Sequence, residues 1–160
     1  MALEISTVGA KVKYAVEVSA GTRPTVNYIE IPNVSSAPDF PMDVETLDAS
    51  DITDTITRYI PGRQDPGTDK EFTLNHTDAV IDFWNDPSTG IVAKYATAKA
   101  AGKAMWFEYC YPGASKSYFF KAEPVALGNG GIEQNAVDTI PAKIIPQGGN
   151  CWAAASTTSA

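Results

Sequence analysis

Three aspartates spaced three residues apart, Asp48, Asp51 and Asp54, are the first residues of this sequence whose type and spacing suggest chemistry. In a loop they could gather a cation, but the glycine and the closing glutamate of a calcium-binding loop are absent. Two carboxylates could also serve a glycosidase, yet 19 acidic residues leave no means of choosing one pair. The spacing therefore favours a solvated acidic face over a metal or catalytic site.

The remaining residues give little support for other kinds of catalytic site. The chain has one histidine, His76, and two cysteines, Cys110 and Cys151. It contains no Gly-x-Ser-x-Gly elbow, no His-Glu-x-x-His pair and no catalytic Cys/His motif. The glycines at 128–131 do not lead into a helix, which argues against a phosphate loop. We therefore predict that the protein is not an enzyme, binds no cofactor or metal, and keeps both cysteines as free thiols.

Acidic charge is concentrated in the first half of the chain. Residues 1–86 carry 15 acids and 6 bases, while residues 87–160 carry 4 acids and 6 bases, giving the net charge of −7. Between Arg23 and Arg58 every charged residue is an acid. Such a surface does not bind nucleic acid by neutralising phosphates, although DNA could slide past it. No apolar run reaches the ~20 residues of a membrane helix, and the start of the sequence does not read as a secretory signal, so we expect no membrane partner.

The elements that must position these residues are mostly strands, because apolar and polar residues alternate with a period of two. The predicted strands cover residues 13–18, 26–31, 42–47, 53–59, 71–74, 104–111, 116–127 and 136–145. Proline and glycine predict a long turn at 60–67 and a hairpin turn at 128–131. Short turns join antiparallel neighbours, which predicts an antiparallel sandwich or small barrel.

One helical insertion at about 77–101 interrupts the strands. Thr77 is a suitable N-cap, apolar residues recur at helical spacing after it, and Gly102 is a natural stop. Pro87 breaks the pattern, either as a kink or as a true loop. The expected fold is mainly β with this insertion (α+β), an antiparallel β-sandwich or barrel flanked by a helix.

The expected domain organisation is simple. We predict one β domain at 1–146, with an arm at 1–10 and a long loop or hairpin at about 43–70. A C-terminal tail at 147–160 follows it. Aromatic residues gather on two consecutive predicted strands, 104–111 and 116–127, where a buried core with one edge is favoured over an exposed row that would bind a partner or a sugar.

Six short segments follow one another in an order that resembles the major tail tube proteins of long-tailed bacteriophages with non-contractile tails. The resemblance covers roughly residues 1–146, and its motifs are loose patterns. The segments are 44–51, 59–62, 71–75, 105–108, 118–122 and 135–143, with the helix between the third and the fourth.

The resemblance implies a structural virion protein whose subunits form rings, usually hexameric, that stack into a hollow tube for DNA ejection. It also implies that inner strands of neighbouring subunits complete a continuous barrel around the lumen. The implied partners are further copies of the chain, the tape measure protein, the tail terminator and the baseplate or tip proteins. DNA would pass without specific binding, because an acidic wall repels phosphate. The implied location is the virion tail, assembled in the cytoplasm of the host bacterium.

Two sets of residues follow from the resemblance as candidate sites. A self-assembly loop would reach a neighbouring subunit, and a set of acids would face the lumen or the seam between rings. The loop consists of Tyr59, Ile60, Pro61, Gly62 and Arg63. The acids are Asp43, Glu45, Asp48, Asp51 and Asp54.

The chain ends give a further hypothesis, that residues 1–7 and the tail act as arms on adjacent subunits.

Two alternative functions remain open. One is a monomeric β-sandwich binding or adhesion module for carbohydrate or protein. The other is the inner-tube protein of a contractile tail, which would need a sheath partner on its outer face.

Overall fold

The computed structural model describes residues 4–157 and divides into two compact units. Residues 39–68 form one of them, which we call the hairpin unit. Residues 4–38 and 69–157 form the other, which we call the sheet unit. The predicted arm at 1–10 is described only from residue 4 onward, and residues 4–10 contain no strand or helix.

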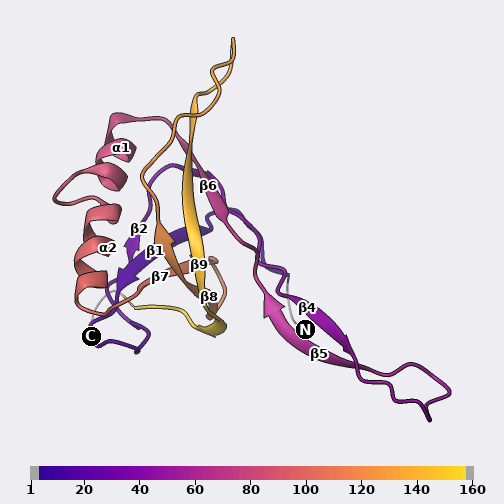
Figure 1. Cartoon of the computed structure of the whole chain (residues 1–160). Coiled ribbons are helices and arrows are strands. Elements are labelled where there is room, and N and C mark those ends of the chain that lie inside the picture. The colour runs from indigo at the N-terminus through magenta and orange to yellow at the C-terminus, as the bar shows by residue number, and fades with distance from the viewer. Residues whose placement is uncertain (1–3, 158–160) are drawn as a thin grey trace. The chain divides into compact units, whose positions relative to one another are not determined.

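A single curled antiparallel sheet of seven strands makes up most of the sheet unit (Figure 1). The predicted mainly-β fold with a helical insertion is thereby confirmed. In spatial order the strands are β2, β1, β7, β8, β9, β6 and β3, and all neighbours are antiparallel. Their bounds are β1 Lys11–Val16, β2 Ile29–Glu30, β3 Val34–Ser36, β6 Lys70–Asn75, β7 Met105–Cys110, β8 Lys116–Pro124 and β9 Thr139–Ala154.

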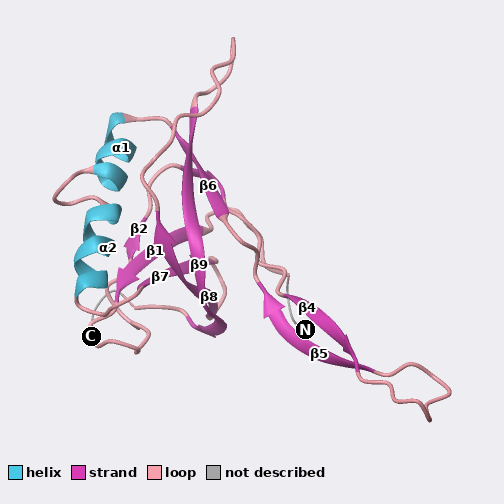
Figure 2. Ribbon diagram, viewed as in Figure 1, coloured by secondary structure: helices cyan, strands magenta, loops and turns pink. Residues whose placement is uncertain are grey.

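The helical insertion consists of two helices, α1 Asp78–Asn85 and α2 Ile91–Ala100 (Figure 2). The predicted N-cap is confirmed, because the Thr77 hydroxyl accepts a hydrogen bond from the Val80 amide at 3.2 Å. The Pro87 interruption is a true loop, in which the Asp86 carboxylate accepts hydrogen bonds from the amides of Ser88 and Thr89.

Aromatic packing forms the core on the side of the sheet that the helices cover. Phe107 of β7 stacks on Phe120 of β8 with ring centroids 5.5 Å apart, and both are fully buried. Tyr14 of β1 lies in register with Phe107 and meets Phe83 of α1 edge-on at 5.8 Å. The buried aromatic core predicted for β7 and β8 is confirmed.

The opposite face of β7 and β8 is covered as well, since Met105, Trp106, Phe107 and Glu108 are all buried. The Arg23 guanidinium lies 4.2 Å from the centroid of the Phe119 ring. The buried Glu108 carboxylate accepts hydrogen bonds from the amide and hydroxyl of Ser156 at 2.9 and 2.6 Å. The segment that follows β9 is therefore anchored to the core by a charge-assisted pair of hydrogen bonds.

Glu17, just beyond β1, is a second buried carboxylate with several donors. It accepts hydrogen bonds from the amides of Ala104 and Gly21 and from the Trp106 indole at 3.0 Å. Burial opposes ionisation of Glu17, but these hydrogen bonds and the nearby Lys121 ammonium outweigh it and lower the pKa of the carboxyl group. Glu17 thus remains charged while it joins the end of β1 to the start of β7.

Three predicted boundaries need correction. β9 continues to Ala154, so the predicted tail boundary at 147 falls inside a strand. The predicted strand 26–31 is reduced to two residues, because Asn27 adopts a left-handed φ of 63° that turns the chain away from β1. The glycines at 128–131 do not form a tight hairpin turn but lie in the longer connection between β8 and β9.

Candidate assembly surfaces

The hairpin unit is a two-stranded ribbon of β4 Asp43–Asp48 and β5 Tyr59–Asp65. Every residue of β4 is exposed, and so is every residue of β5 except Gly62. An isolated two-stranded ribbon is at best marginally stable in water, because it has no covered apolar face. The outer edges of β4 and β5 pair with no other strand among the described residues. This ribbon is therefore suited to gaining stability from a partner.

The chain reverses direction at the tip of the ribbon, residues 49–58, and not at the predicted turn 60–67. Short side chains order this tip: Asp48 accepts a hydrogen bond from the Ser50 amide, Asp51 from the Thr53 amide, and Ser50 from the Arg58 amide. The predicted strand at 53–59 is wrong. Its alternating isoleucines and threonines imitate a strand, while side-chain hydrogen bonds to the backbone favour a loop.

The residues of the predicted self-assembly loop lie in β5 instead. Thr46 pairs with Pro61 and Val44 with Gln64, so Gly62 and Arg63 form a bulge opposite Glu45. Proline and glycine were expected to make a turn, but an edge strand with a bulge accommodates both. The five residues therefore remain together on one exposed strand, as Tyr59, Ile60, Pro61, Gly62 and Arg63.

The predicted lumen or seam acids do not share one face. Alternation along β4 places Asp43 and Glu45 on one face and Asp48 on the other. Asp51 and Asp54 belong to the tip, where Arg58 lies 3.2 Å from Asp54 and 4.0 Å from Asp51. Hydrogen bonds from Ser50 and Thr53 lower the pKa of Asp48 and Asp51, respectively. The hairpin unit thus presents negative charge in several directions.

Exposed apolar side chains accompany these acids, and of these the sequence prediction had singled out only Tyr59 and Ile60. Ile52 is fully exposed and Ile56 is 80% exposed, both in the ordered tip. The strands add Val44, Leu47, Tyr59 and Ile60. Leu47 and Ile60 pair across the ribbon, so one exposed apolar pair lies in the strands and two further isoleucines lie in the tip. A partner could cover these groups.

An unpaired strand edge is the second candidate surface. β6 pairs with residues 139–144 of β9, while β8 pairs along residues 144–154 on the other side. Among the described residues, no strand covers the β6 side of residues 145–154. This segment carries no charged residue, and bulges near Gly148 and Gly149 bend it. The sequence prediction ended the β domain at 146 and missed this edge, because no alternation of apolar and polar residues marks positions 147–154.

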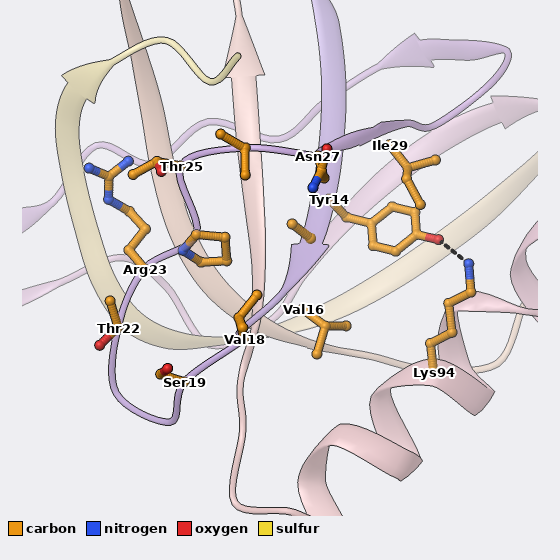
Figure 3. A pocket seen from close by; sticks show the side chains of 13 residues that line it. Tyr14, Val16, Val18, Ser19, Thr22, Arg23, Thr25, Asn27, Ile29 and Lys94 are labelled. Atoms are coloured by element: carbon orange, nitrogen blue, oxygen red, sulfur yellow. Dashed lines mark hydrogen bonds between the residues drawn. The ribbon is translucent and has the colours of Figure 1, made fainter. Parts of the chain in front are cut away.

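A pocket of about 370 Å³ beside β1 is the third candidate surface (Figure 3). β2 pairs with Lys13 and Tyr14, and the Ile31 amide donates to the Val12 carbonyl. On the other side of β2 the turn at Asn27 carries the chain away and leaves the edge at residues 15–16 open. Lys94 and Arg23 lie at opposite ends of the pocket, and Lys94 donates a hydrogen bond to the Tyr14 hydroxyl at 2.9 Å. Between them the lining is largely aliphatic, from Val16, Val18, Pro24, Val26 and Ile29.

Few of the described side chains are arranged for catalysis. Residues 4–157 contain no group of three or more histidine, cysteine or acidic side chains placed to hold a metal ion. His76 pairs with the exposed carboxylate of Asp138. Cys110 and Cys151 are free thiols, as predicted. Neither α1 nor α2 is long and apolar enough to cross a membrane.

No protein-family model matches the sequence. A search of curated proteins finds no significant match.

Proposed function

We propose that this chain is a structural virion protein that polymerises as stacked rings into the hollow tail tube of a long-tailed phage, the conduit for DNA ejection. The hairpin unit is the observation that carries the proposal: a ribbon with two open edges, exposed apolar side chains and no covering layer. Such a ribbon gains stability by adding strands or covering its apolar groups in an assembly. The open edge of β9 at 145–154 offers a second place where strands of neighbouring subunits could pair.

The proposal has two parts, self-assembly and a role in the phage tail, and they are supported by different observations. The exposed ribbon and the open edge support self-assembly, while the order of the sequence segments, which resembles tail tube proteins, supports the tail. The acids of the hairpin unit fit a conduit, because like charge keeps phosphate from adhering. Their mutual repulsion across a ring is about 1 kcal/mol per pair at ~4 Å in water and weaker in salt, so apolar burial can exceed it.

Electron microscopy and sedimentation of two matched variants test the proposal. Leu47→Ser/Ile60→Ser removes a cross-strand apolar pair of the hairpin unit. Ile132→Ser/Val137→Ser removes two exposed apolar residues from the loop before β9. We expect the unmodified chain and the loop variant to form hollow tubes on concentration or with a tail-tip seed. The hairpin variant should remain a 17.0 kDa monomer.

Two results would contradict this expectation. If the hairpin variant forms tubes as readily as the unmodified chain, the hairpin unit is not the assembly element. If the unmodified chain stays monomeric even with the seed, a monomeric binding module becomes the better interpretation of its function. Tubes that also recruit a sheath protein would instead indicate the inner tube of a contractile tail.

The role of the acids needs a separate test. Replacing Asp43 and Glu45, which lie outside the tip, by lysine changes the net charge from −7 to −3, since each replacement changes the charge by +2. Phage particles assembled with this variant should eject DNA more slowly, because lysines bind phosphate. Ejection at the unmodified rate would show that these acids do not face the DNA.

A further inference from the structure

The tip of the hairpin unit and the pocket beside β1 have complementary chemistry. The tip presents two exposed isoleucines on a hydrogen-bonded loop. The pocket is aliphatic, is open to solvent, and is rimmed by Val18, which is 81% exposed. Each surface leaves apolar groups in water that the other could cover.

We propose that the pocket beside β1 receives the tip of the hairpin unit of a second copy, with Ile52 or Ile56 inserted among Val16, Val18 and Ile29. This inference rests on the self-assembly proposed above and names the receptor for the hairpin unit. The tip and the pocket are different surfaces, so each copy offers one of each. Such head-to-tail contacts propagate into rings or filaments, whereas a self-complementary contact would stop at a dimer.

Charge favours the same pairing. The tip and its flanking strand residue carry three acids, Asp48, Asp51 and Asp54, and one base, Arg58, a net charge of −2. The pocket is lined by Lys94 and Arg23 and by no acidic residue, a net charge of +2. Complementary charge of this size orients the encounter and excludes wrong partners, while the buried apolar area supplies most of the affinity.

The tip is also ordered before it binds. Ser50, Thr53 and Arg58 each take part in side-chain to backbone hydrogen bonds that fix the loop, and Arg58 also donates to the Ala49 carbonyl at 3.0 Å. A preorganised loop loses less conformational entropy on binding than a flexible one. The exposed isoleucines thus lie on a loop that these hydrogen bonds fix.

Disulfide trapping between two separately prepared full-length chains tests this contact. In a Cys110→Ser/Cys151→Ser background, one chain carries Ile52→Cys and the other carries Val18→Cys. Mixed under assembly conditions and oxidised, they should give a disulfide-linked dimer containing one of each chain. Val137→Cys, a position 77% exposed and outside the pocket, replaces Val18→Cys in the control. We expect about tenfold more heterodimer with Val18→Cys, because bound cysteines meet at a high effective concentration.

Electron microscopy of the same background separates this inference from the proposed function. Tubes together with the Ile52–Val18 heterodimer support both. Tubes without heterodimer above the control, using Ile52→Cys or Ile56→Cys, overturn the receptor and leave self-assembly standing. Absence of both tubes and heterodimer overturns the two proposals together.

A variant with altered charge in the pocket is an independent test of the same contact. Lys94→Glu should reduce the trapped heterodimer, because it reverses the charge at one end of the pocket. An undiminished heterodimer would contradict the role given to that end. A disulfide that forms readily within a single chain carrying both cysteines would overturn the assignment to a second copy.

Discussion

Phe107 of β7 and Leu47 of β4 are both large apolar residues within an antiparallel pair, yet Phe107 is 0% exposed and Leu47 is 43% exposed. The difference lies in what covers each sheet. β7 has strands on both sides and layers over both faces. Within residues 4–157, β4 has one neighbouring strand and no covering layer. Strand pairing alone is therefore not what stabilises this protein, since burial of the faces supplies the larger share.

This contrast predicts different roles for the two units. The sheet unit should fold cooperatively by itself and hold the chain together. The hairpin unit should add little to the stability of the monomer and much to the stability of an assembly. Trp84, Trp106 and Trp152 all lie in the sheet unit, so tryptophan fluorescence reports its unfolding without interference from the hairpin unit.

The largest expected difference comes from truncating the two apolar residues. Phe107→Ala should lower the free energy of unfolding by about 3–5 kcal/mol, because it leaves a cavity among buried rings. Leu47→Ala should change it by no more than about 0.5 kcal/mol in the monomer. Urea unfolding followed by tryptophan fluorescence measures both. Comparable losses in the two variants would show that the hairpin unit is covered in the monomer.

The next largest effect on stability is expected at a buried carboxylate of the sheet unit, that of Glu17. Glu17→Gln should lower the free energy of unfolding by about 2 kcal/mol at neutral pH. The amide nitrogen of glutamine is a donor, and it would face the N–H groups that now donate to the Glu17 carboxylate. The folded-state pKa of Glu17 is lowered, so its stabilisation is fully present above the unfolded pKa of about 4.3 and is lost as pH falls toward the folded value.

The pH dependence provides the check on Glu17. Urea midpoints measured from neutral pH down through pH 4 should fall less steeply for Glu17→Gln than for the unmodified chain. Equal slopes would mean that Glu17 does not contribute its charge to folding. The exposed Asp48, whose pKa is also lowered, serves as the hairpin counterpart, and Asp48→Asn should leave the slope seen by tryptophan fluorescence unchanged.

Two glycines extend the comparison to backbone packing. A Cβ at Gly90 would lie 2.6–2.7 Å from backbone atoms of Trp84 and Asp86, so Gly90→Ala should cost about 1–3 kcal/mol through overpacking. A Cβ at Gly62 would lie 3.1 Å from the Glu45 carbonyl oxygen, in a ribbon free to adjust. Gly62→Ala should therefore leave the urea midpoint unchanged. A larger effect at Gly62 would contradict the freedom assigned to the ribbon.

The smallest expected effects concern two hydroxyls that each accept a backbone hydrogen bond. Thr77→Ala removes the cap of α1 and should cost about 1 kcal/mol. Ser50→Ala removes the acceptor for the Arg58 amide at 2.7 Å in the tip and should not alter sheet unfolding. It should instead weaken assembly, which sedimentation would detect. Unchanged assembly would argue that order in the tip is not needed for contact between subunits.

Much of the sheet unit could be predicted from the sequence. Alternation located β1, β6, β7 and β8 of this unit within a few residues, as it did β4 of the hairpin unit, and Thr77 and Gly102 marked the ends of the helical insertion. These signals are local, because period-two alternation and capping depend on neighbouring residues. The acidity of residues 43–54 is also visible in the sequence, whereas the role predicted for these acids came from the resemblance.

The misread stretches share a physical cause. Pro61 and Gly62 are typical of turns, but a bulged edge strand accommodates them, and no local signal distinguishes the two. Residues 147–154 looked like a polar tail, since their strand conformation depends on β8, about 30 residues earlier in the chain. The left-handed φ of Asn27 shortened the strand that alternation predicted at 26–31.

The sequence by itself therefore determined the mainly-β composition, the helical insertion, the acidity of the first half and the lack of a catalytic motif. Only the tertiary structure decided which strands are covered and which are open, because coverage depends on residues far apart in the chain. Phe107 is buried and Leu47 is exposed because only the strand of Phe107 has other elements packed over its faces. The pocket beside β1 likewise arises where Asn27 diverts the chain and α2 brings Lys94 to Tyr14.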